Sequence, residues 1–263
     1  MDKFKINGPS KIRGEVSISG SKNAALPILA ATLLFDKNVT IKNLPRVKDI
    51  DTMLNLLKSL GRKISFKNNK KIATISKGKK NNFFAPYSLV KTMRAGILVL
   101  GPLLAKNKKA KVSSPGGCSI GVRPIDIHLK AISKLGVKIQ IEKGYVNAKA
   151  QEGLVGSEIR FSKISVGATE NLILAACLAK GTTTIKNCAI EPEIKDLTNF
   201  LKTAGAKIKW IGKRTLKIEG VKTLKSITYS IMNDRIEAGT FCVAACLNLS
   251  LIHISEPTRH ECI

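Results

Sequence analysis

The chain has 263 residues, and 44% of them are apolar, which is enough for a sizeable buried core and excludes a wholly disordered protein. Its net charge of +27 and pI near 10.0 would suit a nucleic acid or another anionic partner. The 36 lysines and 9 arginines are nevertheless scattered along the chain, and aromatic residues make up only 5% of it. A dedicated nucleic-acid-binding protein is therefore disfavoured, because the stacking platform of a single-strand binder is missing, and the lysines are interpreted mainly as a solvated face.

The N-terminal residues form no apolar core of signal-peptide length, and the longest apolar stretch, residues 95–105, is too short to span a bilayer. We therefore expect a cytoplasmic protein with no membrane partner. In that compartment the six cysteines are expected to be free thiols. Cys242 and Cys246 would share one face of a helix, but no further ligand with zinc-like spacing accompanies them. They are interpreted as small core residues, and no metal site is expected.

The first predicted elements are a helix over residues 24–34, which Ser21 or Asn23 could cap, and a strand over residues 38–43. A second helix is predicted over residues 49–60, since its apolar residues recur at three-to-four spacing. Gly61 is expected to end this helix, because glycine readily adopts the positive φ of the position that follows a helix, and a strand is expected to follow it.

Two further segments repeat this order of elements. The middle segment predicts a helix over 92–105, a strand over 109–113, a helix over 125–135 that ends at Gly136, and a strand from 138. The last segment predicts a helix over 171–179 capped by Thr169, a strand over 182–187, a helix over 193–204 that ends at Gly205, and a strand from 207. The three glycines recur at intervals of 75 and 69 residues. We therefore expect an α/β fold of three helix-strand-helix-strand units that close into one globule with pseudo-threefold symmetry.

The stretch from Ser113 to His128 carries the residues best suited to chemistry. Cys118 follows two glycines and precedes a third, so the backbone can form a mobile loop that carries a reactive thiol. Arg123 presents a planar fork of donors suited to a carboxylate or phosphate, and Pro124 restricts the backbone beside it. Taken alone, the same pattern also fits a Gly-Pro turn with a buried cysteine.

Residues 115–124, Pro-Gly-Gly-Cys-Ser-Ile-Gly-Val-Arg-Pro, resemble the active-site loop of the enolpyruvyl transferases that act on UDP-N-acetylglucosamine. Further segments resemble the same family, in the same order, at residues 21–27, 93–102, 165–171, 191–194 and 234–239. Because these segments are spread over most of the chain and are specific in combination, the chain is identified as a member of this family.

The resemblance implies a fold called the inside-out α/β barrel, in which the helices are buried and the sheets face outward. Two such domains face each other over the active site in this family. Residues 21–232 would form one complete domain that carries the Cys118 loop, and residues 1–20, with an opening strand over 5–18, would belong to the second domain. Residues 233–249 would begin that second domain with a helix, and most of it would be missing. Residues 250–263 match nothing expected there and are interpreted as the non-native tail of a truncated gene fragment.

The reaction implied by the resemblance transfers the enolpyruvyl group of phosphoenolpyruvate to the 3′-hydroxyl of UDP-N-acetylglucosamine and releases phosphate, the first committed step of peptidoglycan synthesis. No cofactor is expected. Lys22 and Arg123 would match the negative charges of phosphoenolpyruvate. Cys118 is the expected general acid, because a thiol with an unperturbed pKa of about 8.5 is still protonated at pH 7. Fosfomycin-type epoxides would alkylate the same thiol.

The resemblance also assigns residues to the two substrate pockets. These residues are Lys22, Asn23, Arg94, Arg123, Pro124, Ile125, Asp126, Ile127, Lys163, Ile164, Ser165, Val166 and Gly167. Other roles remain open for some of them, because Asn23 could cap a helix and Ser165 could belong to a simple turn ahead of a helix. His128 is expected to pack or to cap rather than to react.

The base aspartate and further arginines that this family draws from its other domain have no match in the chain. We therefore expect activity only from the full-length protein, which we expect to be a monomer, and none from the fragment. Three alternatives stay open. The related 3-phosphoshikimate 1-carboxyvinyltransferase shares the repeat and the phosphoenolpyruvate chemistry, a non-catalytic basic RNA-binding domain could use the same platform, and the fragment could be an inert folding unit.

Overall fold

A computed structural model describes residues 14–79, 82–114 and 125–247, together with Lys3, Lys5, Asn7 and Gly8. The contacts within the chain divide it into two compact units, one made of Met1–Ser19 with Asn233–Ile263 and the other of Gly20–Met232. Three residues of the predicted catalytic loop, Cys118, Arg123 and Pro124, lie outside the described residues, as does the tail over 250–263.

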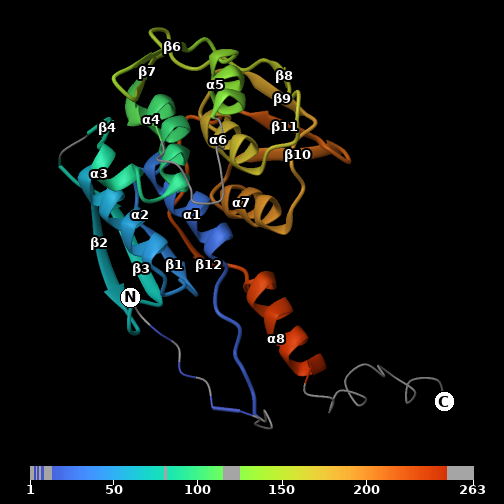
Figure 1. Cartoon of the computed structure of the whole chain (residues 1–263). Coiled ribbons are helices and arrows are strands. Elements are labelled where there is room, and N and C mark those ends of the chain that lie inside the picture. Colours follow the sequence, from blue (N-terminus) through green and yellow to red (C-terminus); the bar gives the residue numbers. More distant parts are fainter. Residues whose placement is uncertain are drawn as a thin grey trace. The chain divides into compact units, whose positions relative to one another are not determined.

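The Gly20–Met232 unit contains three four-stranded sheets with one shared topology (Figure 1). The first is ordered β12 (Ile227–Ser230), β1 (Val39–Lys42), β3 (Ile72–Lys77), β2 (Arg62–Lys67). The second is ordered β4 (Phe84–Ala85), β5 (Lys109–Ser113), β7 (Tyr145–Lys149), β6 (Lys138–Glu142), and the third β8 (Glu158–Arg160), β9 (Thr182–Lys186), β11 (Thr215–Glu219), β10 (Lys207–Gly212). In each order the first pair is parallel and the next two pairs are antiparallel. The threefold α/β repeat expected from the sequence is therefore confirmed.

The first sheet takes its edge strand from the other end of the unit. Strand β12 pairs in parallel with β1, with Ile227 opposite Val39. Beside this pair, the N–H of Ser21 donates to the carbonyl of Met232 at 2.8 Å. These contacts join the two ends of the Gly20–Met232 unit, so the three repeats form one closed body.

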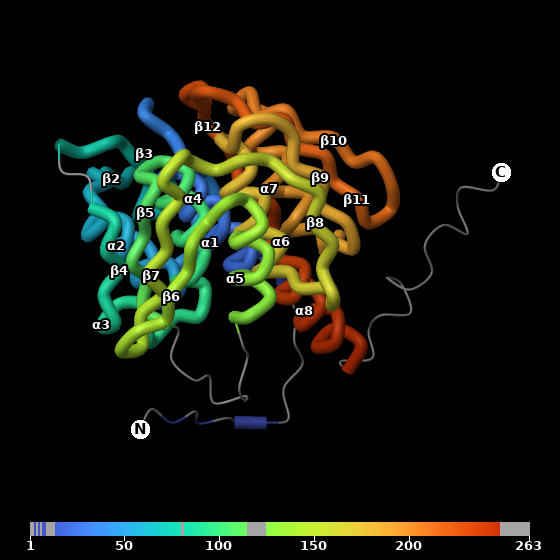
Figure 2. The backbone as a smooth tube through the Cα atoms, turned by 90° about the horizontal axis from the view of Figure 1, so that it is seen from above, coloured from blue at the N-terminus to red at the C-terminus, as the bar shows by residue number. Residues whose placement is uncertain are grey.

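The helices pack between the sheets, and Figures 1 and 2 show α1, α4 and α6 grouped at the centre of the unit. Each repeat has two helical segments. The first segments are α1 (Lys22–Ala31) with η1 (Thr32–Leu34), η2 (Arg94–Val99) with α4 (Leu100–Asn107), and α6 (Val166–Ala176). The second segments are α2 (Lys48–Ser59), α5 (Asp126–Ser133) and α7 (Pro192–Thr203), and a short helix α3 (Tyr87–Val90) precedes η2. Residues 24–31 of α1 are all buried, as is typical of a helix that is apolar on every side. Residues 168–176 of α6 are buried as well, although three of them are polar. Among the described helices, none is both long and apolar enough to cross a membrane.

The predicted helix ends at Gly61 and Gly205 are confirmed, since these glycines directly follow the C-caps Leu60 and Ala204, whereas α5 ends at Ser133, three residues before Gly136. Gly61, Gly136 and Gly205 adopt φ angles of +93°, +85° and +96°, which L-residues with a side chain rarely adopt. Strands β2, β6 and β10 begin within two residues of these glycines. A glycine with positive φ shortly before a strand can be predicted from sequence, because it depends on local backbone geometry alone.

The predicted middle helix over 92–105 is wrong in part, because the structure breaks it into two segments. Met93 is extended, with φ −140° and ψ 108°, and η2 forms 3-10 turns before α4 begins at Leu100. Pro102 explains the restart: it lies in the first turn of α4, where its missing N–H interrupts no helical hydrogen bond. A single helix running through Pro102 would lose one such bond.

The predicted cap of the third-repeat helix is also wrong. Helix α6 begins at Val166, and Ser165 is its cap, with its Oγ accepting from the N–H of Ala168 at 3.3 Å. Thr169 lies inside the helix, where its hydroxyl donates to the carbonyl of Ser165 at 2.7 Å and accepts from the N–H of Ala189 at 3.1 Å. A threonine that bonds the backbone in this way fits a helix interior as well as a cap, so the residue type alone was ambiguous.

Six strands were not anticipated. The central hairpin strands β3, β7 and β11 follow β2, β6 and β10, and their alternation of exposure, as in Thr215–Glu219, was a readable signal. The edge strands β4, β8 and β12 have only two to four residues, which is too short to show a period. Their pairing is decided by neighbours far away in sequence.

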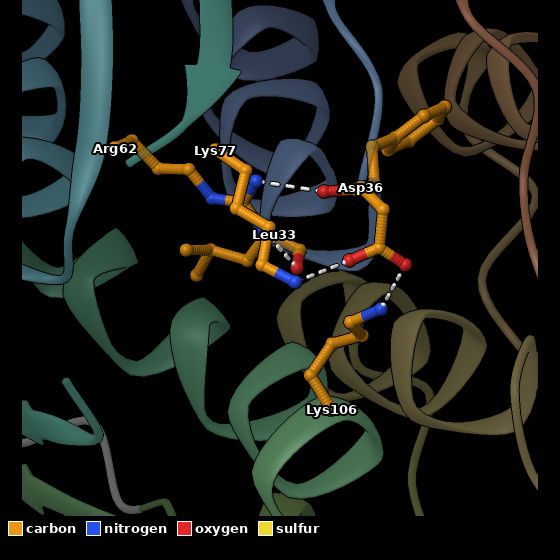
Figure 3. Close-up of polar contacts among 6 residues, drawn as sticks. Leu33, Asp36, Arg62, Lys77 and Lys106 are labelled. Atoms are coloured by element: carbon orange, nitrogen blue, oxygen red, sulfur yellow. Dashed lines mark hydrogen bonds and ion pairs between the residues drawn. The ribbon is translucent and has the colours of Figure 1, made fainter. Parts of the chain in front are cut away.

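Asp36, between η1 and β1, ties three elements of the unit together (Figure 3). Its carboxylate accepts from the Nζ of Lys77 on β3 at 2.8 Å and from the Nζ of Lys106 on α4 at 2.7 Å. Beside it, Arg62 donates to the carbonyl of Leu33 in η1. The hydrogen bonds from Lys106 and Lys77 lower the pKa of Asp36 to about 2, against the opposing effect of partial burial.

The other unit contributes one helix to the described residues, α8 (Arg235–Leu247), whose first N–H groups are capped by the carboxylate of Asp234. The described residues 14–18 of the predicted opening strand over 5–18 form no strand. Cys242 and Cys246 are exposed, so the interpretation of this pair as core residues is wrong. No residue of α8 is buried, since the described part of this unit offers no second element for the helix to pack on.

Candidate functional site

Lys22 lies at the start of α1, where its Nζ is 3.0 Å from the Oδ2 of Asp49 on α2. Both side chains are partly exposed, at 42% and 37%. Asn23 is also exposed, and the cap of α1 is Ser21, whose Oγ accepts from the N–H of Ala24 at 3.3 Å. The capping alternative for Asn23 is therefore wrong. Lys22 is a cation held in place by one carboxylate and still open to an anion from solvent.

A second group of predicted residues gathers around the ring of His128. His128 lies on α5 and is only 3% exposed, which agrees with the expectation that it packs. Burial lowers the pKa of His128, the charge of Arg94, the first residue of η2, lowers it further, and the charge of Asp126, the first residue of α5, opposes these effects. A Cβ placed on Gly167, the second residue of α6, would lie 3.1 Å from the Cε1 of this ring. The starts of η2, α5 and α6 therefore lie around one buried imidazole.

The start of α6 has the form of an anion-binding helix terminus. Ser165 binds the N–H groups of Ala168 and Thr169 through its side chain and carbonyl. The N–H groups of Val166 and Gly167 precede the first helical hydrogen bonds, so they point out of the end of the helix. The exposed residues that flank this terminus are Lys163, Ile164 and Val166. Ser165 thus acts as a cap in a turn ahead of a helix, and this role is compatible with binding a phosphate.

Asn171 on α6 connects the elements behind this group. Its Oδ1 accepts from the N–H of Gly101 at 2.8 Å, and its Nδ2 donates to the carbonyl of Ile97 at 3.0 Å. The same Nδ2 lies 3.3 Å from the Nδ1 of His128. A Cβ on Gly101 would lie 2.5 Å from the backbone carbonyl oxygen of Asn171, so the close approach of α4 to α6 requires glycine there. The amide of Asn171 therefore satisfies the backbone at the break between η2 and α4.

Glu170, the neighbour of Asn171, is a buried carboxylic acid. Its side chain is 5% exposed and lies near the carboxyl groups of Glu193 and Glu191 at the start of α7. Burial raises the pKa of Glu170 to about 8, and the two neighbouring carboxylates add to that shift. Glu170 therefore holds a proton at neutral pH.

The sequence patterns did not single out Asp49, Glu170 or Asn171 as special. A polar Glu-Asn pair directly before the apolar run Leu172–Ala176 was a readable sign of buried polar groups, but the misplaced helix start put this pair at a solvated helix end. Asp49 carried no local signal, since an acidic residue in a first helical turn is common.

The chain has the enolpyruvyl transferase fold. It is similar to the crystal structure of the enolpyruvyl transferase NikO from Streptomyces tendae, with a TM-score of 0.79 and 22% identity over 91% of this chain and 56% of that one. It is also similar to EPSP synthase from Acinetobacter baumannii, with a TM-score of 0.72 and 20% identity over 88% of this chain and 52% of that one. At such identities the likeness speaks for the fold alone.

The chain belongs to the EPSP synthase (3-phosphoshikimate 1-carboxyvinyltransferase) family, whose model matches residues 6–261. Among its relatives, the UDP-N-acetylglucosamine 1-carboxyvinyltransferase of Pelagibacter ubique (strain HTCC1062) is 65% identical over 94% of this chain and 59% of that protein. The protein of the same name from Psychrobacter sp. (strain PRwf-1) is 51% identical over 93% of this chain and 57% of that protein. The chain thus spans less than two thirds of the length of these relatives.

Proposed function

We propose that the chain is part of an enzyme that transfers the enolpyruvyl group of phosphoenolpyruvate to the 3′-hydroxyl of UDP-N-acetylglucosamine, with release of phosphate, in peptidoglycan synthesis in the cytoplasm. The observation that carries this proposal is the high identity to relatives named for this acceptor, set against the low identity to structures of EPSP synthase. A transferase that used 3-phosphoshikimate would be expected to have the higher identity to EPSP synthases and the lower identity to the UDP-N-acetylglucosamine enzymes.

In this proposal the phosphoenolpyruvate site is built around Lys22. Its ammonium group is positioned by Asp49 at 3.0 Å and partly exposed, so an incoming phosphate or carboxylate can bind it without a large rearrangement. Arg123 supplies a second cation. Cys118 donates a proton to the methylene carbon of phosphoenolpyruvate, which makes the adjacent carbon electrophilic towards the sugar hydroxyl. No step requires a cofactor.

In this proposal the sugar nucleotide binds at the group of predicted residues around the ring of His128. The N–H groups of Val166 and Gly167 at the start of α6 bind oxygens of the diphosphate, since they precede the first helical hydrogen bonds and the N-terminal end of a helix favours negative charge. Arg94 adds a cation from the start of η2, and the segment from Pro124 to Ile127 lines the nucleoside side of the pocket.

The test joins residues 1–247 of this chain to the part of the Pelagibacter ubique relative that it does not cover, and measures phosphate release from phosphoenolpyruvate. We expect release to require UDP-N-acetylglucosamine, and Cys118→Ala to lower kcat by a factor on the order of 10² to 10⁴, as for loss of a general acid. Cys242→Ala, which removes an exposed thiol from α8, is the control and leaves kcat unchanged.

Phosphate release that does not depend on the sugar nucleotide would contradict the proposal. Release that depends on 3-phosphoshikimate instead would support the alternative enzyme. Binding of RNA that weakens steeply with salt, without any release of phosphate, would support the basic RNA-binding domain.

A further inference from the structure

The amide of Asn171 has only one possible orientation. Its Oδ1 faces the N–H of Gly101 at 2.8 Å, which can only donate, and its Nδ2 faces the carbonyl of Ile97 at 3.0 Å, which can only accept. Turning the amide over would set donor against donor and acceptor against acceptor. The group that faces the Nδ1 of His128 at 3.3 Å is therefore an N–H donor.

This orientation decides the protonation state of His128. Because its Nδ1 faces a donor, it must accept, and the single proton of the neutral ring must be on Nε2. A charged ring would place a second N–H against the amide of Asn171. Burial and the charge of Arg94 lower the pKa of His128 to about 4, which agrees with a neutral ring at physiological pH.

The other edge of the ring packs on the start of α6. A Cβ on Gly167 would lie 3.1 Å from the Cε1 and 3.3 Å from the Nε2 of His128, so a side chain there would be crowded against the ring unless the ring shifted by a few tenths of an ångström. His128 thus contacts α6 at two places, the amide of Asn171 and the backbone at Gly167, while it is itself part of α5.

We propose that His128, as a neutral Nε2–H imidazole fixed by Asn171, is a positioning residue that holds the starts of η2, α5 and α6 in the arrangement that binds a nucleoside diphosphate. This inference rests on the proposed function and deepens it. The ring acts through the residues that it holds in place, namely the backbone at Gly167 and, by way of Asn171, the carbonyl of Ile97 in η2, and it takes no part in the transfer step. The glycine at 167 serves to admit the ring as well as to expose the end of the helix.

The test uses the joined protein described under the proposed function and measures its affinity for UDP by titration calorimetry at pH 7, together with its thermal unfolding midpoint. His128→Leu keeps most of the volume but removes the acceptor for Asn171, and we expect it to weaken UDP binding by a factor on the order of ten or more, since small misplacements of binding groups are costly. His128→Asn restores an acceptor near the Nδ1 position and is expected to recover part of the affinity. The ¹⁵N shifts of the imidazole are expected to report a neutral Nε2–H tautomer in the wild type.

The control variant is Tyr229→Phe, which removes the hydrogen bond from the hydroxyl of Tyr229 to Asp196 at 2.6 Å, between β12 and α7. It is expected to lower the unfolding midpoint and to leave the affinity for UDP unchanged. Wild-type affinity in His128→Leu, an equal loss of affinity in Tyr229→Phe, or an Nδ1–H or charged imidazole would each overturn the inference and leave the proposed function standing. A joined protein without substitutions that does not bind UDP would overturn both.

Discussion

The carboxyl group of Asp36 lies between two lysines, whereas that of Glu170 lies among other carboxyl groups. Asp36 is partly exposed, at 42%, and the hydrogen bonds from Lys106 and Lys77 lower its pKa to about 2. Glu170 is buried in the centre of the unit, and burial raises its pKa to about 8. The comparison shows that one functional group can be a charged cross-link in one region and a neutral acid in another, because the local polarity and the neighbouring charges differ.

Asn171, the neighbour of Glu170, satisfies two buried backbone groups, which predicts a large effect for Asn171→Leu. This change leaves the N–H of Gly101 and the carbonyl of Ile97 without partners in a buried place. We expect a loss of about 2–4 kcal/mol in the free energy of unfolding, since each unpaired buried group costs ~1–3 kcal/mol. Urea denaturation measures it.

The control for this variant is Asn199→Leu, the same substitution at an exposed position of α7. It is expected to change the free energy of unfolding by less than about 0.5 kcal/mol. Equal losses in the two variants would show that the amide of Asn171 does not stabilise the break between η2 and α4.

The neutral state of Glu170 predicts a pH dependence of stability. Its pKa in the folded chain, about 8, lies above the ordinary value of 4.5, so between these values the folded state binds more protons than the unfolded state. Stability is therefore lost as the pH rises through this window. Glu170→Gln has no proton to lose at this position, so it lacks this pH dependence. The difference between its free energy of unfolding and that of the wild type should therefore increase by up to about 1.4 kcal/mol per pH unit between pH 5 and 8.

Asp36→Asn is the matched variant for this measurement. The pKa of Asp36 is lowered to about 2, so its contribution is complete above its ordinary value of 3.8 and is lost only as the pH falls towards 2. Its stability curve is expected to stay parallel to that of the wild type between pH 5 and 8. A parallel curve for Glu170→Gln as well would contradict a neutral Glu170.

The smallest expected effect is the loss of stability in Asp36→Asn at constant pH. Its two ion pairs are partly exposed and screened by solvent, so we expect a loss of about 0.5–1 kcal/mol at pH 7. The loss should shrink in 1 M salt, where the Debye length is about 3 Å. Glu152→Gln, which removes a negative charge from an exposed turn, should change stability less than Asp36→Asn, and an equal change in both would assign the effect to net charge.

Some residues of the candidate site were predicted from short sequence motifs, whereas the role of others depends on partners that are distant in sequence. The resemblance of short motifs named Arg94, Asp126 and Gly167, and the structure brings these three positions around His128. The buried members of this group, Asn171 and the ring itself, were not assigned a binding role, because their importance comes from partners more than forty residues away. The proposed roles of Cys118 and Arg123 stay predictions, since both residues lie outside the described part of the chain.

The sequence by itself determined the features that depend on a few adjacent residues. Gly61, Gly136 and Gly205 all adopt positive φ between a helix and the strand that follows it, a conformation that glycine adopts without strain, and their spacing revealed the threefold repeat. Only the tertiary structure decided that β12 pairs with β1, that Asn171 bridges α4 to α6, and that Glu170 keeps its proton. These outcomes depend on which distant groups share a buried, low-dielectric environment, and no local pattern contains that information.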